Sequence, residues 1–452
     1  MNEAIALARR PSHAGRSLPA ACLLLFGACA ADAGAPAGET PEPAVAVSGP
    51  AASSQPVAGS WPQFRGPAAD GIVTGETLTV PWPEGGPPQI WRTTVGAGYS
   101  GMTVVDNRLF TLFDQSGSEW LAAYDAATGA ELWRHRQGGA YRDSQGDGPR
   151  STPSVADGVV YALGAQGELA ALRAADGELV WRHALARDFG ARIPTWGAST
   201  QPVVEADLLL VNVGGRGGRS AMAFDRATGE VRWSVGDDGA GYSMPQVFDV
   251  VNDGKTRRQA VFLTAASLLA VDPKTGQELW SQPWSTSYDV NAASPIFVPP
   301  NRLFVSTGYD TGAALFEIVS RGAAFEAREL WRSRGLKNKF SSSVIVGDRI
   351  YGFDNSILKA VDLKTGEDVW RQRGFGHGTL LYADGHFIVL GENCKLALVK
   401  TDPDAYREVS SVQVLGRKCW TMPTLVDGRL FLRDQETMES LRVGPGSAGS
   451  GG

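Results

Sequence analysis

Short apolar runs of strand length, separated by polar turns, fill most of the chain after residue 90. A helix would repeat apolar residues three and four positions apart, and that spacing is almost absent. Two segments, 151–161 and 421–431, each contain an Asp-Gly pair between apolar stretches. Asp-Gly favours the tight turn of a β-hairpin because glycine accepts a positive φ. The pattern therefore predicts an all-β chain built from hairpins.

A second motif recurs in the same region: an apolar or aromatic residue, Asp, two variable residues, Thr-Gly, and a Trp four residues after the Gly. Four copies follow this pattern, one copy replaces Asp by Arg and Thr by Asp, and two units have a lost or lengthened turn. The tryptophans that close the seven units are Trp91, Trp133, Trp181, Trp233, Trp280, Trp331 and Trp370. Their spacing, between 39 and 52 residues, is typical of a repeated unit of four short strands.

Eight hairpin segments and seven tryptophan-ended units predict eight β-sheets arranged as the blades of a ring. The last hairpin, at 421–434, has no outer strand of its own, and the strand that ends at Trp91 is available to supply it. Closing the ring in this way leaves no exposed sheet edge at the junction. We therefore predict an eight-bladed β-propeller of four-stranded antiparallel blades that covers residues 61–443 and is closed by the N-terminal strand.

Residues 1–29 have the composition of an export signal, with arginines followed by an apolar run at 18–28. Eleven apolar residues are too few to span a bilayer, which needs about 20. The run ends Leu-Phe-Gly-Ala-Cys at Cys29 and resembles the lipobox of bacterial lipoproteins, in which the cysteine is lipid-modified. An ordinary secretory signal cut nearby is the alternative. The sequence thus predicts export to the periplasm and a lipid anchor on Cys29 in the outer membrane.

Two segments outside the repeats have compositions that cannot build a core. Residues 30–60 consist mainly of Ala, Pro, Gly, Ser, Glu and Thr and contain no aromatic residue, and residues 444–452 are rich in Gly and Ser. Such segments bury too little apolar surface to offset the entropy of ordering. We expect a disordered tether at 30–60 and a disordered tail at 444–452.

Charge and rare residues narrow the classes of function. The chain has 42 Lys and Arg against 48 Asp and Glu, with no basic run, which excludes a nucleic-acid partner. The motifs of serine hydrolases, P-loop NTPases and zinc proteases are absent, and no residue spacing predicts a metal site. Cys394 and Cys419 are the cysteines within the predicted fold. They fit either a disulfide in an oxidising compartment or two buried thiols.

The Asp-x-x-Thr-Gly-x-x-x-Trp copies, which cover about 90–443, resemble the PQQ-like (quinoprotein-type) β-propeller repeat family. The opening Trp-Pro-Gln-Phe-Arg-Gly-Pro at 61–67 also resembles that family. The resemblance implies that the seven repeat tryptophans are structural and dock between blades. The family that the chain resembles includes quinoprotein dehydrogenases, which bind PQQ and Ca²⁺ in the central funnel, and cofactor-free BamB-type lipoproteins of the barrel-assembly machinery. The vicinal cysteines of many such dehydrogenases are missing, and the lipobox-like Cys29 with its tether matches the second kind.

The resemblance therefore implies a non-enzymatic periplasmic scaffold that binds protein partners at the envelope, barrel-assembly components among them, and needs no cofactor. The alternative is an oxidoreductase that uses PQQ and Ca²⁺ to oxidise alcohols or sugars with a divergent site. A third interpretation is a polysaccharide-binding module with exposed Trp82, Trp120 or Trp284 as its stacking surface.

Residues just before the innermost strands should face the mouth of the central channel. The candidates are Tyr99, Arg150, Trp196, Tyr242, Asp289, Asn291, Lys339, His377 and Trp420. A dehydrogenase would need a carboxylate base, oxygen ligands for Ca²⁺ and an aromatic floor among them. Otherwise these polar side chains merely solvate a channel. Asp289 and Asn291 are the first pair to inspect, since alternate residues of a strand share a face.

Overall fold

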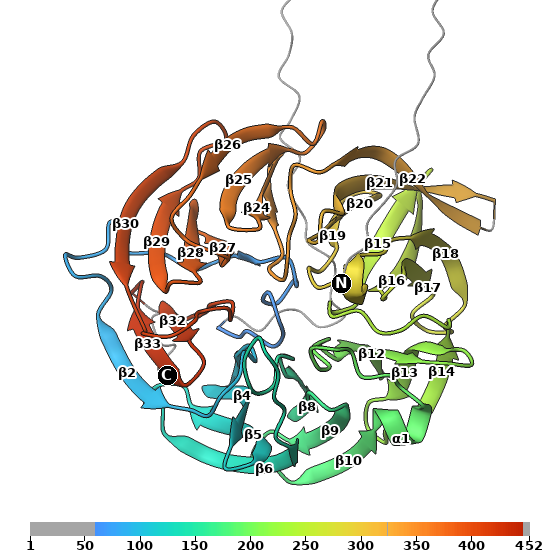
Figure 1. Cartoon of the computed structure of the whole chain (residues 1–452), viewed down its shortest axis with the longest axis horizontal. Helices are drawn as coiled ribbons and strands as arrows, with labels where there is room; N and C mark the ends of the chain where they lie inside the picture. Colours follow the sequence, from blue (N-terminus) through green and yellow to red (C-terminus); the bar gives the residue numbers. More distant parts are fainter. Residues whose placement is uncertain (1–58, 323, 446–452) are drawn as a thin grey trace, which may run out of the picture. The chain divides into compact units, whose positions relative to one another are not determined.

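The computed structural model describes residues 59–445 except residue 323, and these residues form eight antiparallel sheets arranged in a ring (Figure 1). The predicted eight-bladed β-propeller is thereby confirmed. Within the described residues, no helix has the length and apolar character that a bilayer crossing demands. The predicted signal at 1–29 with Cys29, nearly all of the tether at 30–60, and all but two residues of the tail at 444–452 lie outside the described residues.

The first four blades follow one another along the chain. Blade 1 consists of β3 (Thr103–Val105), β4 (Arg108–Gln115), β5 (Ser118–Asp125) and β6 (Glu131–Gly139). Blade 2 consists of β7 (Ser154–Ala156), β8 (Val159–Leu163), β9 (Glu168–Arg173) and β10 (Leu179–Ala184), and the short helix α1 (Leu185–Phe189) follows it. Blade 3 consists of β11 (Val203–Glu205), β12 (Leu208–Gly215), β13 (Arg219–Asp225) and β14 (Val231–Val235). Blade 4 consists of β15 (Gln246–Asn252), β16 (Lys255–Leu263), β17 (Ser267–Val271) and β18 (Glu278–Pro283), and the 3₁₀ turn η1 (Ser287–Asp289) follows it.

The other four blades complete the ring, and the last two of them take strands from the N-terminal part of the chain. Blade 5 consists of β19 (Ile296–Val298), β20 (Arg302–Thr307), β21 (Gly312–Arg321) and β22 (Ala324–Ser333). Blade 6 consists of β23 (Val344–Val346), β24 (Arg349–Asp354), β25 (Ile357–Asp362) and β26 (Asp368–Gln372). Blade 7 consists of β27 (Gly378–Ala383), β28 (His386–Gly391), β29 (Lys395–Lys400) and β30 (Arg407–Gln413), with β1 (Ile72–Val73) added parallel to β27. Blade 8 consists of β31 (Thr424–Val426), β32 (Arg429–Arg433), β33 (Thr437–Arg442) and β2 (Gln89–Thr94).

The ring closes where β2 pairs antiparallel with β33 and places Trp91 opposite Ser440, as the missing outer strand predicted. The fully buried Arg433 of β32 adds a second closure. Its guanidinium donates to the carbonyl of Leu112 at 2.8 Å and to that of Gly96 at 3.2 Å. Burial lowers the pKa of Arg433 to about 10. Carbonyl oxygens thus satisfy this buried cation, and the contact joins blade 8 to blade 1.

The repeat tryptophans connect neighbouring blades. Six of the seven donate the indole N–H to a backbone carbonyl of the following blade, and Trp91 to Ala126 at 3.0 Å is one example. Trp280 instead donates to the side chain of Gln259 in its own blade at 2.7 Å, and the next hairpin, β21–β22, has ten residues in each strand.

The Thr-Gly turn provides the surface on which four of the tryptophans rest, namely Trp91, Trp181, Trp233 and Trp331. In the β13–β14 turn, Asp225 accepts the N–H groups of Ala227 at 2.9 Å and Thr228 at 3.0 Å. Gly229 then has a φ of 78°, and a Cβ at this position would lie 2.7 Å from the ring of Trp181. Glycine is needed twice here, for its left-handed backbone and for the space that the indole occupies.

A segment before the first blade crosses the centre of the ring (Figure 1). The N–H of Phe64 donates to the Gln201 side chain at 2.9 Å, and the fully buried guanidinium of Arg65 donates to the carbonyl of Ser343 at 2.6 Å. Separate cavities on its two sides are lined by Phe64 and by Pro62 respectively. The segment 61–71 therefore divides the central channel, which the sequence did not predict.

We predict that Gly229→Ala destabilises the propeller by about 3 kcal/mol, because alanine adds left-handed strain and forces Trp181 from its seat. The control is Gly254→Ala in the β15–β16 turn, where φ is 71° and no atom lies within 4 Å of the added Cβ. It carries the strain alone, about 1 kcal/mol. Urea unfolding of both variants measures the difference, and equal losses would contradict the role assigned to the tryptophan contact.

Candidate functional site

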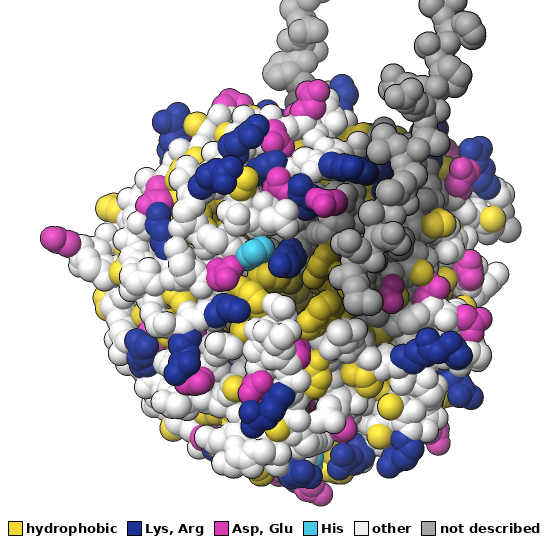
Figure 2. All heavy atoms as spheres, viewed as in Figure 1, with side chains coloured by type: hydrophobic (Ala, Val, Ile, Leu, Met, Phe, Trp, Pro, Cys, Tyr) yellow, Lys and Arg dark blue, Asp and Glu magenta, His cyan; other side chains and the backbone are white. Residues whose placement is uncertain are grey.

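A cavity of about 230 Å³ lies at the centre of the ring, lined mainly by connections that lead from one blade into the inner strand of the next. Figure 2 shows hydrophobic side chains gathered in this hollow. The rings that line it are Phe64, Tyr99, Trp196, Tyr242, Tyr309, Phe340 and Trp420. The described lining also holds the cations Arg150 and Lys339 but no Asp or Glu. The cavity is therefore aromatic and positively charged.

Two thirds of the funnel candidates line this cavity. They are Tyr99, Arg150, Trp196, Tyr242, Lys339 and Trp420. Each precedes an inner strand, which is the signal that identified it. Phe64, Tyr309 and Phe340 were missed. Phe64 comes from the segment that crosses the ring, and Tyr309 lies in the β20–β21 turn with a φ of 56°, so neither carries that signal. Phe340 follows Lys339 directly and could have been found from it.

The other three candidates lie elsewhere. Asp289 is exposed at the end of η1, and Asn291 is buried with its amide donating to the carbonyl of Thr264 at 2.7 Å. The expectation that these two residues share a strand face is not met, because a turn replaces the strand. His377 contacts Glu392 at 2.8 Å. Burial opposes ionisation of Glu392, but the hydrogen bonds from His377 outweigh it and lower the pKa of this carboxyl.

The two cations of the cavity differ in their surroundings. Arg150 pairs with Asp143 at 2.7 Å, donates to the carbonyl of Gly148 at 2.6 Å, and lies over the rings of Tyr99 and Tyr141. Lys339, by contrast, makes no side-chain hydrogen bond or ion pair with any described residue. The net positive charge of the lining therefore resides on Lys339.

Trp420 forms one wall of the cavity. Its ring centroid lies 5.0 Å from that of Tyr99 and 4.7 Å from that of Phe340, and the ammonium of Lys418 lies 4.1 Å from the indole centroid. Burial raises the pKa of Tyr99 to about 12. A tyrosine phenol is neutral at physiological pH even at its ordinary pKa, and the wall presents flat, uncharged rings to the cavity.

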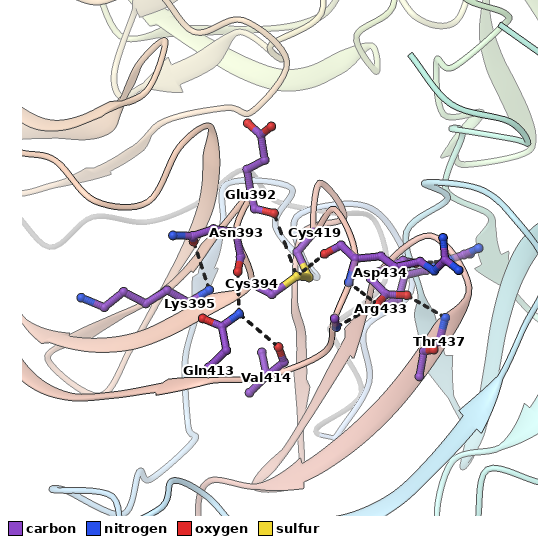
Figure 3. Close-up of a disulfide and its surroundings, with 12 residues drawn as sticks. Glu392, Asn393, Cys394, Lys395, Gln413, Val414, Cys419, Arg433, Asp434 and Thr437 are labelled. Carbon is purple, nitrogen blue, oxygen red and sulfur yellow. Dashed lines mark hydrogen bonds between the residues drawn. A yellow bond between two sulfur atoms is a disulfide. The ribbon is translucent and has the colours of Figure 1, made fainter. Parts of the chain in front are cut away.

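A disulfide between Cys394 and Cys419, with an S–S distance of 2.07 Å, resolves the alternatives that the sequence left open. It joins the β28–β29 turn to the connection that carries Trp420 (Figure 3). The N–H of Cys419 donates to the carbonyl of Glu392 at 3.1 Å, and Asp434 accepts the N–H of Arg417 at 3.0 Å. The bond and these contacts brace the aromatic wall.

Two of the three tryptophans considered for a polysaccharide surface are buried. Trp82 is 5% exposed and Trp284 is 2% exposed. Trp120 donates its indole N–H to the carbonyl of Gln115 at 3.2 Å and lies under Arg134. The predicted exposure of Trp82 and Trp284 is therefore wrong, and no stacking surface forms from this set.

Ca²⁺ takes six to eight oxygen ligands, which include carboxylates, backbone and side-chain carbonyls and water. The described lining offers hydroxyl and amide oxygens but no carboxylate. The pair considered for this task, Asp289 and Asn291, does not line the cavity.

Comparisons with known proteins agree with the architecture. The family model described as outer membrane protein assembly factor BamB matches residues 117–372, more than half of the chain. The chain is 26% identical over 328 residues to the BamB of Burkholderia pseudomallei, which covers 67% of this chain and 74% of that protein. It is 30% identical over 159 residues to a quinoprotein ethanol dehydrogenase of Pseudomonas aeruginosa, 32% of this chain but only 24% of the dehydrogenase. The crystal structure of BamB from Moraxella catarrhalis aligns with a TM-score of 0.52 at 15% identity, covering 78% of this chain and 97% of that one.

We predict that replacing both Cys394 and Cys419 by alanine lowers the free energy of unfolding by about 3 kcal/mol, the typical value for a cross-link that closes a loop of this length. Acrylamide should also quench tryptophan fluorescence more strongly, because Trp420 loses its brace. Treating the wild-type protein with a reductant provides the control, and the reduced protein should unfold along the same curve as the double variant. A reductant without effect on the curve would contradict the bracing role.

Proposed function

The chain belongs to the PQQ-like propeller family whose model is described as outer membrane protein assembly factor BamB, and we propose that it is a non-enzymatic scaffold that binds a protein partner. The observation that carries this proposal is the central cavity, which combines aromatic rings with an unpaired cation and no carboxylate among its described lining. Aromatic residues are enriched at protein-recognition surfaces, and Trp and Tyr are enriched among the residues that contribute most of the binding energy.

The same lining argues against an alcohol or sugar oxidoreductase. Proton abstraction from an alcohol needs a base within hydrogen-bond reach of the reacting group, and calcium sites commonly include carboxylate ligands. Neither is supplied by the described lining residues. The match to the quinoprotein ethanol dehydrogenase covers about a quarter of that enzyme, so its activity is not carried over to this chain.

We further propose that the chain is exported and held at the periplasmic side of the outer membrane by a lipid on Cys29. The apolar run at 18–28 and the small residues before Cys29 support this proposal. An anchored propeller would meet envelope partners, including barrel-assembly components, without diffusing away from them.

The scaffold is tested by placing a photo-crosslinking amino acid at Tyr288, which is 74% exposed beside the cavity and lies edge-on to Trp196. The control position is Lys364 in the β25–β26 turn, at the opposite ends of the strands. In cells we expect crosslinking from position 288 to give discrete protein adducts, and we expect that none of these adducts forms from position 364. Saturable dye reduction by the purified protein with PQQ, Ca²⁺ and ethanol would overturn the non-enzymatic assignment.

The anchor has its own test. We expect Cys29→Ala to move the protein from the membrane fraction to the soluble periplasmic fraction, since the cysteine is the attachment point of the lipid. Cys22→Ala, which removes a cysteine inside the apolar run, serves as the matched control and should leave the distribution unchanged. Membrane retention of the Cys29→Ala variant would show that the attachment lies elsewhere.

A further inference from the structure

The rings around the cavity are fixed before any partner arrives. Trp420 packs between Tyr99 and Phe340 and is braced by the adjacent disulfide at Cys419. Across the cavity lining, the backbone N–H of Trp196 donates to the hydroxyl of Tyr242 at 3.2 Å. Flat rings that are already held by their neighbours lose little freedom when another ring packs on them, which favours binding of an aromatic group.

Lys339 gives the cavity a charge without a counter-charge. In blade 6, Lys359 lies 2.8 Å from both Asp354 and Asp368, whereas the described residues provide no such partner for Lys339 in the connection that leads into this blade. Lys339 is half-buried and lines the cavity, so a carboxylate that enters the cavity could form a charge-assisted hydrogen bond with its ammonium.

Two serine hydroxyls beside the cavity, those of Ser243 and Ser294, lack a hydrogen-bond partner, unlike the hydroxyls of the neighbouring connections. Thr200 donates its hydroxyl to the carbonyl of Ser243 at 2.8 Å, as Ser151 does to Thr200 at 2.9 Å. The hydroxyls of Ser243 and Ser294, which line the cavity and are 2% and 4% exposed, have no partner among the described residues. Buried hydroxyls are normally hydrogen-bonded, so the wall of the cavity contains two hydroxyl groups whose hydrogen-bonding capacity is unused.

We propose that the cavity accepts an aromatic side chain of a partner protein together with a carboxylate of the neighbouring residue in that protein. The ring would pack against Trp420 and its neighbours, and the carboxylate would bind the ammonium of Lys339. The inference rests on the proposed scaffold function and specifies which feature of the partner is recognised. A protein segment is favoured over a small molecule because Tyr288 extends the aromatic surface beyond the cavity and is 74% exposed.

The probe is the capped peptide Gly-Ser-Phe-Asp-Ser-Gly, titrated calorimetrically into the full protein. We expect it to bind at least about 10-fold more tightly than the matched peptides in which Phe is replaced by Ala or Asp by Asn, since each lacks one recognised group. Equal affinity of the three peptides, or no binding at millimolar concentration, would overturn the proposal. Phenylacetate is a further arm, and binding as tight as that of the peptide would overturn the assignment to a protein segment.

The Lys339→Met variant tests the charge, with Lys364→Met on the opposite face as the matched control. We expect Lys339→Met to weaken the Phe-Asp peptide about 10-fold and leave the Phe-Asn peptide unchanged, a pattern that misfolding would not produce. Unchanged affinity for Phe-Asp would overturn the role of Lys339. If these titrations fail while position 288 still gives crosslinks, the proposed recognition of an aromatic residue with a carboxylate is wrong but the scaffold function stands. If the titrations fail and position 288 gives no crosslinks, the scaffold function is wrong as well.

Discussion

The contact between a tryptophan and the Thr-Gly turn of the following blade is the interaction on which the ring depends. The aspartate folds the turn around its carboxylate, the glycine clears the space for an indole, and the carbonyl after the aspartate accepts the indole N–H. A single motif therefore shapes its own blade and receives the tryptophan of the preceding one. Because the contact recurs around the ring, each blade is positioned by its neighbours as much as by its own strands.

The cavity is a consequence of ring closure. Tyr99 and Trp420 are far apart in the sequence, yet their ring centroids lie 5.0 Å apart because β2 and Arg433 join the last blade to the first. The aromatic wall then needs local support, since the connection that carries Trp420 has no strand of its own. The disulfide at Cys419 provides that support.

Most of the fold could be predicted from sequence because its determinants are local and repeated: the Asp-Gly hairpins, the Thr-Gly turns and the tryptophan spacing. The lining residues before inner strands could be found for the same reason. Long-range contacts could not. Phe64 reaches the cavity through a hydrogen bond to Gln201, 137 residues away. Tyr288 and Asp289 have positive φ values and form a turn where a strand was expected. Trp284 is buried and donates its indole N–H to the hydroxyl of Thr307, and no sequence pattern predicts this contact.

The segment that crosses the ring also determines how the molecule bears mechanical load. Trp61 bonds to Val104 in blade 1, Arg65 to Ser343 before blade 6, and β1 to β27 in blade 7. A pull applied at residue 59 would therefore have to detach these three attachments in turn before it reached β2 at the rim. The segment thus protects β2, the strand that closes the ring, from force applied at the N-terminal end of the described residues.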